Sequence, residues 1–371
     1  MGKVTIRKTK ICYFGTYEKE YPRNRIIIEG LRKNDIEVIE CNVGSLLGRH
    51  RGFFPFNYIN LIKKFFEVKI RSGFDAIIVG YSMVGSFIDI FLARLLTRKT
   101  IIFNPSISLY ETLVSDRRIV RNFFLKKVLY YVEKCAYFLA DIVLMDTNQH
   151  VNYISKQFGI RKRKIKKVFV GAEQSIFYPR KTVKDDNNFL VLFYGKFIPL
   201  HGIEYIIKAA KILENEKNLK FLIIGRGQTS KEIMHLASKL RIKNVSFIDW
   251  VKYEDLPVFI NKADVCLGIF SKGEKAMRVI PNKAFQVLAT KKPLITGSSP
   301  AAIEIFTHKK NVILCDMANP KALSTSILLL KENEKLRQDI SRSGYMLFKE
   351  AFTPEKVGEA VKYFLNQEMT R

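Results

Sequence analysis

Short apolar runs alternate with helical patterns along the whole chain, and this alternation constrains the fold more than any other feature. Each run is short enough for a strand and is followed by a segment with the apolar spacing of a helix. Such alternation is typical of βαβ units and parallel sheets. In the first half we predict strands at residues 10–14, 36–41, 75–80, 100–103, 141–145 and 167–170, and helices at 23–33, 57–72, 84–97 and 117–140.

A second series of the same kind follows the charged segment "YPRKTVKDDNN" (178–188), which lacks apolar periodicity and is interpreted as a linker. Because 371 residues exceed one ordinary hydrophobic core, we predict two Rossmann-like, doubly wound α/β domains at residues 1–180 and 189–350. The predicted strands are 189–194, 220–224, 244–248, 264–268, 293–296 and 311–314, and the predicted helices are 202–215, 230–240, 254–262, 281–291, 320–330, 333–350 and 355–367.

The cysteines and the longest apolar stretch exclude two other classes of protein. The five cysteines lie far apart without CxxC spacing, which indicates buried thiols in a reducing compartment and no zinc site. The stretch "AIIVGYSMVGSFIDIFLARLL" (76–96) is long enough for a membrane span, but Asp89 and Arg94 interrupt it. We expect a buried strand, a glycine loop and a helix there, and no secretory signal at the N-terminus.

The net charge of +28 points to an anionic partner. Residues 1–185 hold 34 Lys and Arg against 16 Asp and Glu, so most of the excess lies in the first half. Residues 57–73 and 117–140 mix cations with aromatic side chains, as do helices in a lipid interface, although a core-facing helix with a basic exterior has the same pattern. No nucleic-acid-binding motif is present. We therefore expect contact with an anionic membrane surface and no nucleic-acid partner.

The stretch "YGKFIPLHGIEYIIKAAKIL" (194–213) predicts a site for a negatively charged group. Gly195 and Lys196 follow an apolar strand, and His201 and Gly202 precede a helix. The N-terminus of a helix attracts anions, and glycine lets a ligand approach the backbone closely. A connecting loop with incidental cations remains the alternative on this segment alone.

A second segment has the same arrangement. "SKGEKAMRVIPNKAFQVLATKKPLITG" (271–297) follows the strand at 264–268, and Arg278 and Lys283 flank Pro281, a residue suited to the first turn of a helix. Two cationic helix N-termini in one domain can hold both phosphates of a diphosphate.

These segments carry a resemblance to a known family. In their order along the chain, "FYGKFIPLHGIEYII", "FLIIGRG", "VSFIDWVKYEDLPVFINKADVCLGIF" and "RVIPNKAFQVLATKKPLITG" resemble the donor-binding half of GT-B glycosyltransferases, most closely glycosyltransferase family 4 (glycosyl transferases group 1). The opening "KICYFGTYEKEYPRNRIIIEGLRKNDIEVIEC" is similar to that family's first strand, glycine loop and helix. The resemblance implies two domains facing across a cleft, with the helix at 354–371 returning to the first.

The resemblance also implies an activity and a set of binding residues. It implies a retaining hexosyltransferase that uses a nucleotide-diphosphate sugar. Lys196, His201 and Arg278 stand at positions that contact the diphosphate or the sugar, and Gln286 stands at the position that contacts ribose. Trp250 and Val251 match the turn at the nucleobase, and Gly15 and Thr16 match the N-domain loop that faces the donor. The remaining expected donor-site residues are Gly195, Gly225, Arg226, Asn282 and Lys283.

Arg278 and Gln286 depart from the family, because both positions usually hold glutamate. Two alternatives stay open on this ground: a GT-B protein that binds a nucleotide sugar without transferring it, and a sugar-nucleotide epimerase. The chain contains no DxD triplet, so we expect no metal cofactor.

The acceptor side is expected in the first domain. Glu111 and Asp116 follow the strand at 100–103 and are the candidates for a catalytic base, although both are also suited to capping the next helix. His150 is interpreted as a surface residue that can alternatively reach the cleft, and Arg23 as a surface charge or a phosphate contact. We expect a lipid-linked or cell-surface glycan as acceptor, and a cytoplasmic protein at the inner face of the cell membrane.

Overall fold

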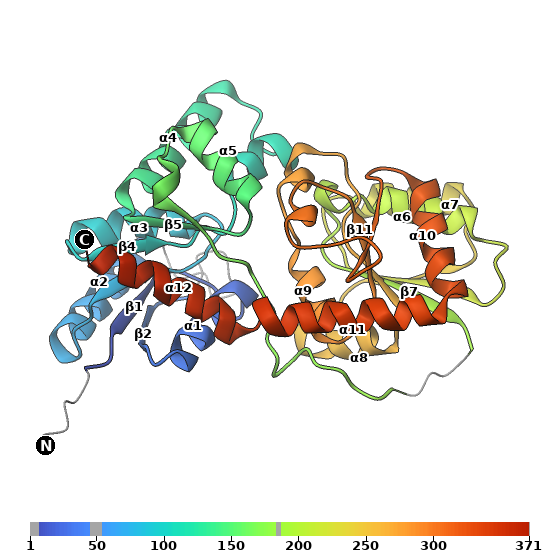
Figure 1. The fold of residues 1–371 in the computed structure, drawn as a ribbon. Coiled ribbons are helices and arrows are strands. Elements are labelled where there is room, and N and C mark those ends of the chain that lie inside the picture. Colours follow the sequence, from blue (N-terminus) through green and yellow to red (C-terminus); the bar gives the residue numbers. More distant parts are fainter. Residues whose placement is uncertain (1–6, 45–53, 183–186, 371) are drawn as a thin grey trace, which may run out of the picture. The chain divides into compact units, whose positions relative to one another are not determined.

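The structure, a computed structural model, describes residues 7–44, 54–182 and 187–370 (Figure 1). It divides into two compact units, unit 1 with residues 1–170 and 353–371 and unit 2 with residues 171–352. Each unit is built on a six-stranded sheet whose neighbouring strands are all parallel. The predicted α/β fold with two doubly wound parallel sheets is therefore confirmed.

Unit 1 has the strand order β2-β1-β3-β4-β5-β6. Its strands are β1 (Lys10–Gly15), β2 (Glu37–Asn42), β3 (Ala76–Val79), β4 (Thr100–Phe103), β5 (Ile142–Met145) and β6 (Ile165–Lys167). Its helices are α1 (Pro22–Lys33), α2 (Phe54–Arg71), α3 (Gly85–Leu96), α4 (Phe123–Leu139), α5 (Asn148–Phe158), α12 (Pro354–Met369) and a π-helical turn, η1 (Glu111–Asp116).

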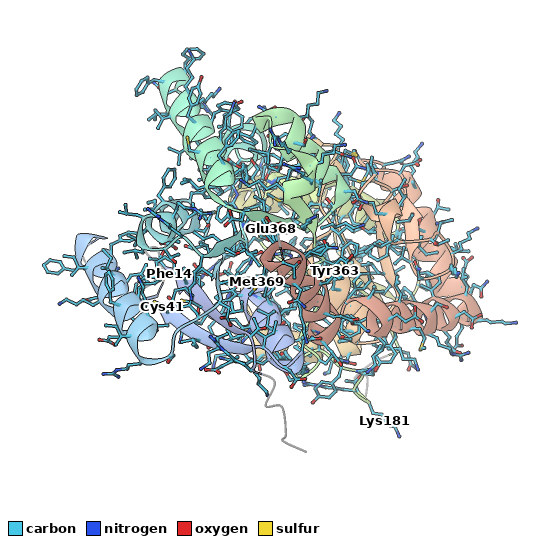
Figure 2. All side chains as sticks on the ribbon, turned by 60° about the vertical axis from the view of Figure 1, so that its left-hand side comes forward. Phe14, Cys41, Lys181, Tyr363, Glu368 and Met369 are labelled. Atoms are coloured by element: carbon cyan, nitrogen blue, oxygen red, sulfur yellow. The ribbon has the colours of Figure 1, made fainter. Side chains whose placement is uncertain are left out.

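Strands β1, β3 and β5 of unit 1 are buried on both faces, as expected for inner strands that are almost wholly apolar. Phe14 and Cys41 lie on neighbouring strands within this core (Figure 2). Four of the five cysteines are buried as predicted, but Cys135 is exposed on α4. The exposure follows from the helix period, which turns Cys135 away from its buried neighbours Ala136 and Tyr137.

The C-terminal helix α12 packs on α1 within unit 1 (Figure 1). The two helices cross at Gly30 and Gly358, where a Cβ on Gly358 would lie 2.1 Å from the carbonyl carbon of Gly30. Asn34, at the end of α1, donates to the carbonyl of Glu355 and accepts from Lys362 through its own carbonyl. Glycine at both positions is what allows the two backbones to touch.

Unit 2 has the strand order β12-β11-β10-β7-β8-β9. Its strands are β7 (Phe189–Tyr194), β8 (Leu219–Ile224), β9 (Val245–Ile248), β10 (Val265–Leu267), β11 (Leu294–Gly297) and β12 (Ile313–Cys315). Its helices are α6 (Ile203–Ile212), α7 (Ser230–Lys239), α8 (Leu256–Lys262), α9 (Asn282–Ala289), α10 (Pro320–Glu332) and α11 (Glu334–Ala351). The chain builds the sheet outward from β7 to β9 and then from β10 to β12, so the order reverses between β7 and β10.

Two predicted elements differ from the structure. The last strand of unit 1 is Ile165–Lys167 and not 167–170, because β5 ends at Met145, which already pairs with Lys167. The helix predicted at 117–140 begins only at Phe123, because Arg118 adopts a left-handed φ of 52° and the Asn122 side chain caps the helix by accepting from the Leu125 amide.

The boundary between the units lies earlier than the charged segment 178–188. Residues 178–182 are held by unit 2, since Asn261 accepts from the Arg180 amide and donates to the Tyr178 carbonyl, and Thr182 donates to the Asn261 carbonyl. Residues 183–186 of the predicted linker lie outside the described residues.

The apolar stretch 76–96 forms the buried strand β3, a loop and helix α3, as predicted. Within the described part of the chain, no helix combines the length and the hydrophobicity needed to cross a membrane.

Candidate functional site

The predicted anion-binding loops of unit 2 both leave the sheet where its strand order reverses. The loop after β7 contains Gly195 to His201, and the loop after the neighbouring strand β10 leads through Arg278 to α9. In an open parallel sheet, the carboxyl ends of strands at such a reversal form the usual ligand-binding crevice. The two sequence segments that predicted a phosphate site are therefore adjacent in the fold.

Lys283, on the first turn of α9, lies at the centre of this region. Its side chain is 5% exposed, and Nζ lies 3.7 Å from the centroid of the Phe193 ring. No acceptor among the residues that the structure describes takes a hydrogen bond from this nitrogen. Burial lowers the pKa of Lys283 well below its ordinary value. A buried ammonium group without an anionic partner is costly, so an anion beside Lys283 would stabilise its charged form.

Gly195 brings the first loop close to this lysine. Its φ of 144° is one that side chains rarely adopt, and a Cβ there would lie 3.0 Å from Lys283 Nζ and 3.1 Å from His201 Cε1. Gly225, after β8, is restricted in the same way, since a Cβ would lie 2.0 Å from the Gly195 carbonyl oxygen. The two glycines thus let the loops after β7 and β8 pack directly on each other.

His201 is 8% exposed and is oriented by the loop that contains it. Its Nδ1 lies 2.6 Å from the carbonyl oxygen of Lys196, an acceptor, so Nδ1 carries a proton. The remaining nitrogen, Nε2, can therefore donate to a phosphate only when the ring is positively charged. Gly202 has a left-handed φ of 64° and precedes α6; a Cβ there would lie 2.5 Å from the Ser271 amide of the second loop.

The other expected diphosphate contacts are more accessible. Lys196 is exposed, and Asn282 and Arg278 are half-buried. Arg278 donates to Glu274 at 2.9 Å, which fixes the guanidinium near the start of α9. Arg226 is exposed and pairs with Asp249 at 3.0 Å.

Gln286 is buried within a chain of hydrogen bonds. Its Oε1 accepts from the Tyr194 hydroxyl at 3.0 Å, and its Nε2 donates to the Tyr253 hydroxyl at 3.2 Å. Tyr253 in turn donates to Glu173 at 2.7 Å. Both ends of the amide are thus occupied by the protein at 4% exposure, which the sequence did not reveal. Trp250, the expected nucleobase neighbour, is 61% exposed beyond β9, and Val251 is half-buried.

In unit 1, the turn at Gly15 and Thr16 is held by the carboxylate of Asp89. In the sequence, Asp89 was noted only because it interrupts the apolar stretch 76–96. Asp89 Oδ2 accepts from the Thr16 amide at 2.7 Å and from the Thr16 hydroxyl at 3.0 Å. Burial raises the pKa of Asp89 to about 7. A Cβ on Gly15 would lie 2.5 Å from Asp89 Oδ2, so glycine is required at this turn.

A buried polar cluster follows β4 and β5 of unit 1. His150 has no exposed surface, and its two ring nitrogens face Asp146 and Glu111, with Nε2 3.4 Å from Glu111 Oε2. Burial lowers the pKa of His150, but the two carboxylates outweigh it and raise the pKa to about 9. The interpretation of His150 as a surface residue was therefore wrong, because helix α5 turns it inward.

Arg23 is likewise buried, contrary to the surface position considered for it. Its Nε donates to Asn104 at 2.7 Å and its Nη1 to the Val168 carbonyl at 3.0 Å. Of the two candidate bases, Glu111 has no exposed surface, whereas Asp116, at the end of η1, is half-buried.

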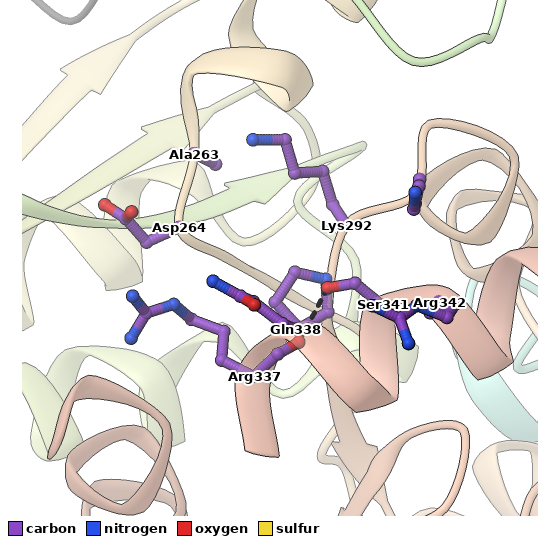
Figure 3. Close-up of a pocket in the computed structure, with 9 residues that line it drawn as sticks. Ala263, Asp264, Lys292, Arg337, Gln338, Ser341 and Arg342 are labelled. Atoms are coloured by element: carbon purple, nitrogen blue, oxygen red, sulfur yellow. Dashed lines mark hydrogen bonds between the residues drawn. The ribbon is translucent and has the colours of Figure 1, made fainter. Parts of the chain in front are cut away.

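A cavity of about 310 Å³ lies at the opposite edge of the unit 2 sheet, before β10 and β11. Figure 3 shows Lys292, Arg337 and Arg342 among its lining side chains. It contains none of the residues predicted to bind a donor, so it is separate from the Lys283 region.

Two Rossmann-like units, each built on a parallel six-stranded sheet, define the GT-B class of fold. Anabaena HepE, in a complex with UDP-glucose, superposes with a TM-score of 0.72 at 14% identity, over 96% of this chain and 99% of that one. Residues 174–346, somewhat less than half of the chain, match the model of the family Glycosyl transferases group 1.

Curated relatives agree with this assignment. The uncharacterized glycosyltransferase MJ1178 of Methanocaldococcus jannaschii is 28% identical over 189 residues, which are 51% of this chain and 50% of that protein. The capsular polysaccharide biosynthesis glycosyltransferase CapM of Staphylococcus aureus is 22% identical over 253 residues, 64% of this chain and 65% of that protein. The chain thus spans about half the length of MJ1178.

Proposed function

We propose that the protein is a glycosyltransferase that transfers a hexosyl group from a nucleotide-diphosphate sugar to a glycan acceptor. The observation that carries the proposal is the buried ammonium group of Lys283, which lies beside Gly195 and His201 at the strand-order reversal of unit 2. The family of residues 174–346 and the names of the relatives support the same class of reaction.

The proposed chemistry is stabilisation of the leaving group. As the bond to the sugar breaks, negative charge grows on the departing diphosphate. In this proposal, the buried Lys283 and His201 donate to the diphosphate from the interior, and the more accessible Lys196 and Arg278 donate to it from the loop surface. The N-termini of α6 and α9 add their partial positive charge. Donors fixed in advance are the most effective way to stabilise such charge, each worth roughly 3 kcal/mol.

We further propose that transfer is metal-independent and retaining. The four cationic side chains and two helix N-termini can neutralise a diphosphate without a divalent ion, and the resemblance to family 4 supports retention of configuration. Activity that is unchanged by EDTA and lost on Lys283→Met agrees with this proposal; activity abolished by EDTA and restored by Mg²⁺ contradicts it.

UDP-sugars are the first donors to test, because HepE binds UDP-glucose with a similar fold. In this proposal, ribose lies near Gln286 and the base near Trp250 and Val251. Since both ends of the Gln286 amide are already hydrogen-bonded, only its second N–H is left to contact a ribose hydroxyl.

The acceptor is proposed to be a lipid-linked or cell-surface glycan, reached at the inner face of the cell membrane. The name of CapM and the charge of +28 support this proposal. Asp116 is the more accessible candidate for a base, and Glu111 would act through His150 as a positioning residue.

The second candidate function is nucleotide-sugar binding without transfer, or epimerisation of the bound sugar. It is favoured by Arg278 and Gln286 in place of two glutamates. The test is incubation with a panel of nucleoside-diphosphate sugars and a membrane lipid extract, with measurement of nucleotide release and of the recovered sugar. Nucleotide release supports transfer. Stabilisation of the protein without release, or a changed sugar on the intact nucleotide, supports the second candidate.

A further inference from the structure

A cavity of about 510 Å³ lies in unit 1 between the end of η1 and the beginning of α4. Its walls are Val114, Ser115 and Val120 together with three cations, Arg118, Arg121 and Lys126. Asp and Glu are absent from this lining in the part of the chain that the structure describes. The cavity exists because residues 117–122 are not helical: Arg118 has a φ of 52°, and Asn122 starts α4 afresh.

Large apolar side chains are exposed around this basic cavity. Ile119 is 60% exposed, Phe123 and Phe124 are each 71% exposed, and Leu125 is 54% exposed. Single exposed apolar residues are normal, but these four lie within seven residues, in the same segment that supplies most of the cavity lining, and are here called the rim. Exposed apolar groups of this kind mark interaction sites. Lys127 adds a further cation, with Nζ 4.6 Å from the centroid of the Phe123 ring.

The cavity walls are tied to the interior of unit 1. Glu133 of α4 is buried and accepts from the amides of Leu109 and Tyr110, which immediately precede η1. Glu111, the first residue of η1, faces His150 in the buried polar cluster. The two elements that form the cavity are therefore fixed to each other, and the exposed rim projects from a supported base.

We propose that this cavity binds the phosphate group of a lipid, with the rim of Ile119, Phe123, Phe124 and Leu125 inserted into the adjoining acyl layer. A site with cations at its base and apolar side chains at its edge is complementary to an amphiphile whose charged group is a phosphate. The phosphate can come from an anionic phospholipid or from a polyprenyl phosphate that carries the acceptor. The inference rests on the proposed function, since it names the membrane partner of that reaction.

Vesicle flotation of the full chain tests the site. The vesicles are phosphatidylcholine alone, or phosphatidylcholine with either phosphatidylglycerol or a polyprenyl phosphate at matched surface charge. The site variant replaces Arg118, Arg121 and Lys126 by Gln, and the rim variant replaces Phe123 and Phe124 by Ser. A matched control replaces three exposed cations of the same unit, Arg161, Lys162 and Arg163, by Gln and removes the same charge.

We expect binding to one or both kinds of phosphate-bearing vesicle and at least about tenfold weaker binding to phosphatidylcholine alone. The site and rim variants should each lose at least about tenfold in binding, and the control less than about threefold. If the protein binds vesicles that contain phosphatidylglycerol, a phospholipid headgroup supplies the phosphate. If it binds only vesicles that contain the polyprenyl phosphate, the lipid carrier of the acceptor supplies it.

Three results would overturn the site: equal loss of binding in the site variant and the control, equal binding to vesicles of phosphatidylcholine alone, or no binding to either kind of phosphate-bearing vesicle. Nucleotide release from the donor in solution, measured on the same variants, separates this failure from that of the proposed function. If the site variant still releases nucleotide and Lys283→Met does not, the proposed donor site stands even when the lipid site has failed its test.

Discussion

The ammonium nitrogen of Lys283 lies over the face of the Phe193 ring, 3.7 Å from its centroid, at the carboxyl edge of the unit 2 sheet. The ring offers a modest cation–π attraction, but it does not replace the hydrogen bonds that a lysine has in water. Lys283 is thus a buried amine whose charged form requires a nearby anion, so both stability and ligand binding should depend on pH.

The stability of the free protein should depend on Lys283 as pH changes. Because burial lowers its pKa in the folded state, the unfolded chain binds more protons between that lowered pKa and the unfolded value of about 10.4. Between these two pKa values, the free energy of unfolding therefore rises with pH because of Lys283. We expect Lys283→Met to melt above the wild type near neutral pH, with the difference shrinking as pH approaches about 10. A difference that is constant across this range would contradict the assigned burial.

Binding of a diphosphate should bring a proton to Lys283 in the same pH range. An adjacent anion favours the charged amine, so calorimetric titration with UDP in two buffers of different ionisation enthalpy should reveal proton uptake. Uptake that persists in Lys283→Met would assign the proton to His201 instead.

His150 should show the opposite dependence on pH. Its pKa is raised to about 9 in the folded state, above the usual value of about 6.5. Its stabilising contribution is therefore complete below pH about 6.5 and is lost as pH rises through about 9. The melting temperatures of the wild type and His150→Gln should differ most below pH about 6.5 and converge above pH about 9. The exposed His235→Gln is the control, and an equal pH profile for both variants would count against the buried cluster.

The hydrogen-bond chain of Gln286 explains why glutamate is absent at this position. Tyr253 already donates its single hydroxyl proton to Glu173, so a carboxylate at 286 would face an oxygen without a proton. We expect Gln286→Glu to lower stability by about 1–3 kcal/mol. The double change Glu173→Gln with Gln286→Glu should restore most of the loss, because Tyr253 can donate to the new carboxylate and accept from the new amide. Thermal unfolding of the three variants checks this; a double variant no better than the single one would argue against the chain.

The contact of α1 with α12 should be intolerant of any side chain at its crossing. Gly358→Ala places a Cβ 2.1 Å from the Gly30 carbonyl carbon, so the helices must separate. We expect a loss of about 3 kcal/mol in the free energy of unfolding by denaturant titration. Glu359→Ala, on the exposed side of the same helix, removes only a surface pair with Lys356 and should leave the stability nearly unchanged. Similar losses in the two variants would mean that the close approach does not limit stability.

The order of elements was predictable from local patterns, because each strand is a short apolar run and each helix repeats its apolar face. The loop from Gly195 to Gly202 was predictable for a related reason: glycine and cations between a strand and a helix are typical of a loop that binds an anion. The break at 117–122 was not, since apolar and basic residues continue through it with helical spacing and only the left-handed Arg118 interrupts it.

The burial of individual polar residues depended on partners distant in sequence. Asn104 and the Val168 carbonyl accept hydrogen bonds from the Arg23 guanidinium. Glu111 approaches His150 only because β4 and β5 lie side by side. The sequence predicted Lys283 as a cation near a helix N-terminus, but its burial over Phe193 requires β7 and α9 to be packed together. The fold was thus accessible from local periodicity, whereas the electrostatic state of the site was not.

The most direct test of the donor site is calorimetric titration of the wild type, Lys283→Met and the exposed control Lys291→Met with UDP and other nucleoside diphosphates, together with thermal unfolding of each protein. We predict that Lys283→Met folds with equal or higher stability and binds the preferred nucleotide about 100-fold more weakly, a loss of about 3 kcal/mol, while Lys291→Met binds as the wild type does. Equal affinity in the wild type and Lys283→Met would show that the diphosphate does not bind at this lysine.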